Sequence, residues 1–313
     1  MIGIILNPRS GYVAEHGLAH VRAQVTAALP EVRIHVLQRG DDLAACCREL
    51  IADGATCIAA AGGDGTVNAV AAHLVGTQTP LGVIPAGTLN HFARDVGVGR
   101  DVAHALHVLA GGYSLPVDVA RVNERLFLNN SSIGLYARMV EIRRRYEARL
   151  GKWRALVHAA RMVVRHARAT EVRFGDGETL ESVRTYLLFV GNNQYELDLL
   201  HLGQRSCLDA GELCCFILEA PGRLALMPHV FHFLRGHRPS EHVFRSLCTH
   251  ELTVIPGRAR RVEVACDGEV FTLVAPLVYR ILPRALKVVV PKPPPPESRE
   301  MRGAPNAHLG TLR

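Results

Sequence analysis

The sequence predicts an α/β domain followed by a β-rich domain. In the first third of the chain, short apolar runs alternate with amphipathic helical stretches, and glycine-rich segments follow several of these runs. From about residue 115 onwards, strand-like runs separated by turns replace this alternation. Strand–helix alternation is typical of a parallel sheet covered by helices, whereas consecutive strands are typical of antiparallel sheets. With 313 residues, of which 48% are hydrophobic, the chain is long enough for two domains with a sizeable core.

The first domain is expected to span residues 1–116 and to contain a doubly wound parallel sheet. The expected strands are residues 2–6, 32–37, 56–61 and 81–84, and the expected helices are residues 13–29, 42–52 after a cap at Asp41, and 67 to about 74. Ligands of such sheets bind beyond the carboxyl ends of the strands. The segments NPRSG (7–11), GGDGT (62–66) and PAGT (85–88) all follow expected strands, so we expect them to line one cleft.

The second domain is expected to span residues 117–290 and to form a mostly antiparallel β-sandwich with a helical insertion. Its expected strands are residues 117–122, 126–130, 171–174, 185–191, 214–218, 252–255, 261–265 and 270–274. The expected helices are residues 135–167 and 223–235. The segment from residue 291 to 313 is rich in proline and charge and has no apolar period, which predicts a disordered tail.

Composition restricts the classes of partner. The formal net charge is +7, but no aromatic stacking set or nucleic-acid-binding motif accompanies the basic residues, so we expect no nucleic acid partner. The eight cysteines contain no CxxC pair, which predicts reduced, buried thiols in a cytosolic protein. No run of about 18 apolar residues is present, so we expect any membrane contact to be peripheral.

The GGDGT segment has the features of a phosphate-binding loop. Gly62 and Gly63 allow close approach of backbone amides, Thr66 adds a hydroxyl donor, and the following helix offers its N-terminus to an anion. The segment lacks the lysine of a Walker loop, and Asp64 would repel phosphate oxygens. A Mg²⁺ ion between Asp64 and the phosphates resolves this conflict. The alternative is that Asp64 and Gly65 form only a turn between strand and helix.

Together these motifs resemble the diacylglycerol kinase catalytic domain, and more closely the soluble bacterial lipid kinases of that superfamily, which also includes sphingosine and ceramide kinases. The resemblance rests on NPRSG, on GGDGTVNAV (62–70), on PLGVIPAGTLNHFARDVGV (80–98), on residues 118–140 and on ACDGEV (265–270). It covers residues 1–291. It implies an N-terminal nucleotide domain related to NAD kinase and phosphofructokinase, a C-terminal lipid domain, and a site in the cleft between them.

The resemblance also implies site residues and cofactors, which are ATP and Mg²⁺. The ATP-binding positions it implies are Asn7, Ser10, Gly62, Gly63, Asp64, Gly65, Thr66, Asn68 and Thr88. Glu269 of the DGE segment matches the general base for the lipid hydroxyl, and Asp267 would orient that base or assist the metal. From the residues alone, Asp267 and Gly268 also predict a hairpin turn, which would place the acid at the cleft.

Three positions depart from the family pattern. His91 replaces an acid in GTLNHFA, and Ala69 replaces a glutamate after GGDGTVN. Ala210 stands where the family often has an aspartate of a second, structural Mg²⁺ site, which leaves Asp209 or Glu212 to compensate.

Residues 136–168 predict a basic amphipathic helix, with ten Lys or Arg against two acids and apolar residues at steps of three and four. This helix is expected either to lie on an anionic membrane surface or to pack its apolar stripe on the second domain. His229 and His232 form a pair at i, i+3 without an evident third metal ligand.

The sequence is therefore interpreted as an ATP- and Mg²⁺-dependent lipid kinase, cytoplasmic and peripherally associated with the inner membrane. The alternatives are a soluble NAD kinase-like enzyme and a catalytically weak lipid-binding or regulatory homologue. A homodimer is a further expectation, because members of this superfamily often pair.

Overall fold

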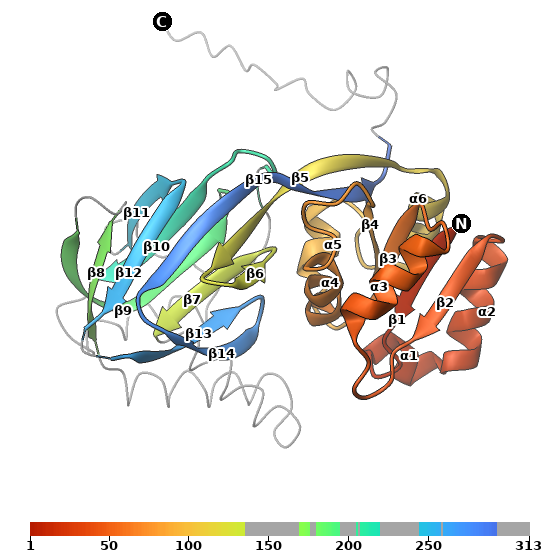
Figure 1. The fold of residues 1–313 in the computed structure, drawn as a ribbon, viewed down its shortest axis with the longest axis horizontal. Coiled ribbons are helices and arrows are strands. Elements are labelled where there is room, and N and C mark those ends of the chain that lie inside the picture. Colours follow the sequence, from red (N-terminus) through yellow and green to blue (C-terminus); the bar gives the residue numbers. More distant parts are fainter. Residues whose placement is uncertain are drawn as a thin grey trace, which may run out of the picture.

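The computed structural model describes residues 1–134, 169–175, 180–194, 205, 207–219, 244–257 and 259–292. Two units are visible in Figure 1, one of strands and helices near the N-terminus and one built of strands, and two long strands, β5 (Tyr113–Val122) and β15 (Leu277–Val290), run between them. The predicted fold class is confirmed.

The N-terminal unit is built on four parallel strands in the order β2-β1-β3-β4. These are β1 (Ile2–Leu6), β2 (Val32–Val36), β3 (Cys57–Gly62) and β4 (Leu81–Pro85). Every residue of β3 and β4 is buried. Because successive side chains of a strand point to opposite faces, complete burial means that both faces of the sheet are covered.

Six helices accompany this sheet in the described chain: α1 (Gly11–His16), α2 (Leu18–Ala28), α3 (Leu43–Ala52), α4 (Asp64–Ala71), α5 (His91–Asp95) and α6 (Val102–Gly111). The single helix predicted over residues 13–29 is two helices, because Gly17 between them has a φ of 87°. The cap of α3 is Asp42 rather than Asp41, since the Asp42 side chain accepts a hydrogen bond from the Ala44 amide. Helix α4 begins at Asp64 rather than Val67, so the last three residues of the GGDGT segment lie in its first turn.

The C-terminal unit consists of antiparallel strands in the order β14-β13-β7-β9-β8-β12-β15, with β10 paired to β9 and β11 paired to β10. The strands not yet given are β6 (Arg125–Phe127), β7 (Asn130–Gly134), β8 (Thr170–Gly175), β9 (Glu181–Asn192), β10 (Leu213–Glu219), β11 (Phe244–Thr249), β12 (Glu251–Pro256), β13 (Arg261–Cys266) and β14 (Glu269–Val274). Each strand predicted in this unit overlaps an observed one, but the single strand predicted over residues 126–130 covers the end of β6 and only the first residue of β7. β7, β11 and β15 were not predicted as strands of their own.

Strands β5 and β15 join the two units. They pair antiparallel from Tyr279 opposite Val122 to Val290 opposite Tyr113, with an irregularity between Leu282 and Leu286. Near its end β15 also pairs in parallel with β4, where Val288 lies opposite Leu81. The predicted boundary between residues 116 and 117 falls inside β5, and residues 286 and 288–290 belong to the hydrophobic core of the N-terminal unit.

Two cysteines differ from the expectation of reduced thiols. Cys214 on β10 and Cys248 on β11 lie opposite each other and form a disulfide. The remaining six cysteines are free, and five of them are buried. In the described part of the chain, no helix has both the length and the apolar character needed to cross a bilayer.

Three predicted segments lie outside the described residues. They are the basic segment 136–168, the helix expected at 223–235, which includes the histidine pair, and the tail from residue 293.

Candidate functional site

A cavity of about 410 Å³ lies beyond the carboxyl ends of the parallel strands. The residues that line it are Asn7, Ser10, Gly11, Leu37, Leu43, Gly63, Gly65, Thr66, Ala69, Gly87, Thr88 and Glu269. Its volume is in the range of small-molecule sites. The cavity brings together the three N-terminal motifs, as predicted, and adds one side chain, Glu269, from the C-terminal unit.

Glycines allow the GGDGT and PAGT segments to touch through their backbones. A Cβ atom on Gly87 would lie 2.3 Å from Cα of Gly63, and a Cβ on Gly62 would lie 2.5 Å from the side chain of Thr66. Real Cβ atoms do not approach other atoms so closely, so these positions require glycine for steric reasons. The wall of the cavity between the two segments is consequently main chain, which offers amide groups rather than side chains to a ligand.

The first turn of α4 faces this cavity through Gly65 and Thr66. The residue that precedes the helix is Gly63, and no side chain caps the first amides. Nδ2 of Asn7 donates to Oγ1 of Thr66 at 2.9 Å, and the Ser10 hydroxyl donates to the Asn7 carbonyl at 2.8 Å. The loop after β1 is thereby attached to a helix N-terminus of the kind that binds anions.

The described lining of the cavity carries little charge. Among the described residues that line it, none is a lysine or an arginine, and the one charged residue is the carboxylate Glu269. A triphosphate in this cavity would therefore be neutralised only by helix and amide dipoles unless a cation accompanied it. This donor set fits a nucleotide that brings Mg²⁺ with it.

Asp64 holds the start of α5 rather than lining the cavity. Its Oδ1 accepts a hydrogen bond from the Phe92 amide at 3.2 Å. Among the described residues, Asp64 belongs to no group of three His, Cys, Asp or Glu side chains close enough to surround one ion. Its expected role as a Mg²⁺ ligand stays a prediction.

Asn68, also expected at the nucleotide, points to the junction of the two units instead. Its Nδ2 donates to the Leu126 carbonyl at 3.4 Å, and its Oδ1 is buried with no hydrogen-bond partner among the described residues. It does not line the cavity.

The DGE segment forms a tight hairpin turn that brings Glu269 to the cavity. Cys266 of β13 pairs with Glu269 of β14, and the two residues between them, Asp267 and Gly268, have φ angles of 47° and 80°. Two positive φ angles are the geometry that Asp-Gly hairpins favour, so the predicted turn is confirmed. A Cβ atom on Gly65 would lie 2.6 Å from Oε1 of Glu269. The exposed carboxylate of Glu269 is thus directly next to the first turn of α4.

Asp267 is anchored to the backbone and does not line the cavity. Its carboxylate accepts three amide hydrogen bonds, from Leu128 at 2.7 Å, Asn129 at 2.8 Å and Asn130 at 3.1 Å. Burial raises the pKa of Asp267 to about 6, against the opposing effects of the three amides and of the Arg205 charge. The side chain therefore fixes the position of the turn that carries Glu269.

A buried ion pair that the sequence analysis did not find connects α5 to the same region. Nε of Arg205 lies 2.8 Å from Oδ2 of Asp95, and both side chains are 1% exposed. Arg205 also donates to the Leu128 carbonyl at 2.7 Å. Burial raises the pKa of Asp95 to about 6, although the charges of Arg205 and Arg94 oppose this shift. Asp95 lies in the segment 80–98, which carries part of the family resemblance. Nothing in the sequence around Arg205 indicates a partner 110 positions away.

For the expected second metal site, the structure describes the contacts of Asp209. Asp209 is half-exposed and lies 3.8 Å from the Arg284 guanidinium. The buried carboxylate of this region is Asp118, which accepts from the amides of Gly211 at 2.6 Å and Arg284 at 2.7 Å. Asp209 belongs to no group of three ligand side chains within the described residues, and its role in metal binding stays a prediction.

The chain is similar to known lipid kinases. Residues 1–122 match the diacylglycerol kinase catalytic domain. The chain is 41% identical over 105 residues to a probable lipid kinase, YegS-like, of Klebsiella pneumoniae, which covers 32% of this chain and 35% of the relative. It is 28% identical over 297 residues to the diacylglycerol kinase of Bacillus subtilis, covering 92% of this chain and 96% of that protein.

A solved structure has the same architecture. The crystal structure of a candidate diacylglycerol kinase from Bacillus anthracis matches with a TM-score of 0.74 at 25% identity, covering 92% of this chain and 94% of that one. The chain thus spans about a third of the length of the Klebsiella relative, and nearly the whole length of the two Bacillus proteins.

Proposed function

We propose that this chain is an ATP-dependent lipid kinase, because residues 1–122 match the diacylglycerol kinase catalytic domain and the chain is similar to diacylglycerol kinases over most of its length. It would transfer the γ-phosphate of ATP to the hydroxyl of a membrane lipid such as diacylglycerol. The observation that carries this proposal is the position of Glu269, whose carboxylate lies beside the first turn of α4 in the cavity formed by the three N-terminal motifs.

The N-terminal motifs supply the nucleotide-binding half of the reaction. The main chain at Gly63 and Gly87, the first turn of α4 and the hydroxyls of Thr66 and Thr88 would hold the phosphates. Mg²⁺, with Asp64 as the proposed ligand, would supply the positive charge that the described cavity lining does not provide. Phosphoryl transfer depends mainly on such positioning and charge stabilisation.

Glu269 supplies the acid–base half. As the lipid hydroxyl oxygen attacks the γ-phosphorus, Glu269 accepts the hydroxyl proton. The bond between the γ-phosphorus and the bridging oxygen breaks, and ADP leaves with the electron pair. Glu269 is exposed, so it can return the proton to solvent. Asp267 holds the turn that carries Glu269 and contributes by positioning it.

A lipid acceptor requires that the enzyme reaches a membrane surface. We propose peripheral association with the anionic inner face of the membrane through the basic segment 136–168, on the basis of its ten Lys or Arg residues. The cytoplasmic side of the membrane is also where ATP is available.

A phosphoryl-transfer assay tests the proposed function. The full chain is incubated with labelled ATP, Mg²⁺ and anionic vesicles that contain diacylglycerol, ceramide or another alcohol lipid, and with NAD as a soluble acceptor. We expect label in the lipid fraction, and we expect Glu269→Gln to lower kcat by about 10²–10⁴-fold.

The matched control is Glu263→Gln, which removes an exposed carboxylate from the same hairpin away from the cavity. We expect it to retain activity. Label on NAD alone, or no transfer to any acceptor by a folded chain, would contradict the proposal.

A further inference from the structure

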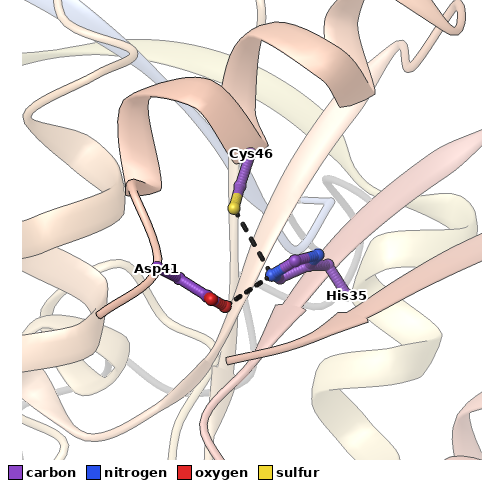
Figure 2. Close-up of side chains that lie close together, drawn as sticks. All are labelled: His35, Asp41 and Cys46. Carbon is purple, nitrogen blue, oxygen red and sulfur yellow. Dashed lines mark hydrogen bonds and ion pairs between the residues drawn. The ribbon is translucent and has the colours of Figure 1, made fainter. Parts of the chain in front are cut away.

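Three side chains that are not part of the proposed reaction converge beside the cavity. His35 is on β2, Asp41 lies in the connection that follows, and Cys46 is on α3 (Figure 2). Nε2 of His35 lies 2.9 Å from Oδ2 of Asp41 and 3.3 Å from Sγ of Cys46. All three ligand atoms lie within 4.8 Å of one another.

This geometry does not match a nucleophile–histidine–acid relay. In such a relay the acid binds one ring nitrogen and the nucleophile binds the other. Here both Asp41 and Cys46 approach the same nitrogen, Nε2, as Figure 2 shows. A single ring nitrogen carries either a proton or a lone pair, so it can satisfy only one of these two contacts well.

We propose that Nε2 of His35, a carboxylate oxygen of Asp41 and Sγ of Cys46 bind one divalent cation of borderline-soft character, for which Zn²⁺ is the appropriate probe. A nitrogen, a sulfur and a carboxylate oxygen are the three donor types that zinc takes in proteins. The hard cations Mg²⁺ and Ca²⁺ prefer oxygen ligands and are disfavoured by the thiolate.

The distances require little rearrangement. With zinc bonds of about 2.0–2.3 Å, a tetrahedral ion holds such nitrogen and oxygen atoms about 3.3 Å apart and nitrogen and sulfur atoms about 3.6 Å apart. The observed separations of 2.9 Å and 3.3 Å are a few tenths of an ångström shorter, so small side-chain rotations would admit the ion.

The surroundings suit a site that is supported on one side and open on the other. The Gln38 amide donates to Oδ2 of Asp41 at 2.8 Å and so orients the carboxylate, as outer-shell groups do at metal sites. Cys46 is buried, whereas the side chains of His35 and Asp41 are 35% and 24% exposed. A fourth ligand, such as water, would approach from this exposed side.

The site would also affect the cavity. Leu37 and Leu43, which line the cavity, lie between the three ligands in the sequence. A bound ion would tie β2 to α3 and restrict the connection that carries both leucines. This consequence for nucleotide binding rests on the proposed function, but the metal site itself does not.

Zinc binding by paired cysteine variants tests the site. The full-length chain is stripped with a chelator, equilibrated with Zn²⁺ and desalted, and its bound zinc is measured by atomic spectroscopy. The variants are Cys46→Ala and, as the matched control, Cys47→Ala, which removes the neighbouring buried thiol from outside the cluster. We expect the wild type and Cys47→Ala to retain one more zinc per chain than Cys46→Ala.

Zinc bound elsewhere on the chain, for example near Glu212, Cys214 and Cys248, contributes equally to the stoichiometry of each variant. The difference between the variants therefore reports on the proposed site alone. Co²⁺ serves as a second probe, because a thiolate–Co²⁺ charge-transfer band should be present in Cys47→Ala and absent in Cys46→Ala. Circular dichroism checks folding, and His35→Asn gives an independent loss of the site without changing a cysteine.

Equal zinc stoichiometry in the wild type, Cys46→Ala and His35→Asn would overturn the proposal. Equal loss in Cys46→Ala and Cys47→Ala would also overturn it. Neither result would bear on phosphoryl transfer, which is measured separately with the Glu269 variant.

Discussion

Two turns from different units meet at the cavity, and they use their acids in related ways. The Gly63–Thr66 turn follows a fully buried strand, whereas the turn at Asp267 and Gly268 follows the buried half of β13, and each turn contains an Asp-Gly pair. In both turns the aspartate accepts backbone amides of another segment, one amide for Asp64 and three for Asp267. The turns differ in what they present to the cavity, which is a helix N-terminus in one case and the carboxylate of Glu269 in the other.

The comparison shows that an acid within a conspicuous motif need not face the ligand. Asp64 and Asp267 fix the positions of the two turns, and of these three acids Glu269 is the one whose side chain lines the cavity. The two turns are also connected. The Phe92 amide links Asp64 to α5, the Asp95–Arg205 pair links α5 to the Leu128 carbonyl, and the Leu128 amide binds Asp267. This path gives the two halves of the site a common framework.

Removing the anchor of the second turn should have the largest effect on folding. Asp267→Ala would leave three amides without their acceptor, and we expect it to lower the free energy of unfolding by about 3 kcal/mol or more. Glu269→Ala, at an exposed position, should change it by less than about 0.5 kcal/mol. Urea unfolding followed by circular dichroism measures both. Equal losses in the two variants would show that the two acids of the turn do not differ in role.

The Asp95–Arg205 pair, which links the two turns, should make the stability of the fold depend on pH. The pKa of Asp95 is raised from 3.8 to about 6, so the folded chain binds this proton more tightly than the unfolded chain. The contribution of Asp95 to stability is therefore complete below about pH 4 and is lost as the pH rises through 6. Relative to Asp95→Asn, the free energy of unfolding of the wild type should fall by up to about 3 kcal/mol between pH 4 and pH 7.

Unfolding midpoints of the two proteins across this pH range measure the difference, and groups that titrate in both proteins largely cancel. A difference that grows in favour of the wild type as the pH rises would contradict the prediction. It would mean that attraction to Arg205 outweighs the burial of the Asp95 carboxylate.

The sequence predicted the strands that carry the site better than the contacts within it. Apolar runs identified β1, β3 and β4, and the rule that ligands bind beyond their carboxyl ends placed NPRSG, GGDGT and PAGT in one cavity. Strand β15 was missed because Pro283 and the charged residues around it interrupt its apolar pattern. At this point β15 has its irregular register, with Arg284 at a φ of 52°.

Side-chain directions within the site depend on tertiary contacts that no local pattern contains. The orientation of Asp64 follows from the packing of α5, because the amide that it binds belongs to Phe92, 28 positions later in the sequence. The pairing of Asp95 with Arg205 joins residues 110 positions apart. The Asp-Gly hairpin is the exception, because its φ angles are set by the two residues themselves.

A change in folding smaller than that of Asp267→Ala separates the two roles of Asp64. Asp64→Asn keeps an oxygen that can accept from the Phe92 amide, so we expect the free energy of unfolding to change by less than about 1 kcal/mol. The substitution removes the charge, so Mg²⁺-dependent transfer should fall sharply if Asp64 binds the metal as proposed. Asp64→Ala, which loses both the acceptor and the charge, should reduce both quantities. If Asp64→Asn instead retained full transfer activity at limiting Mg²⁺, Asp64 would act only as the counterpart of Asp267, an acid that positions a turn, and the cation would have to be held by other groups.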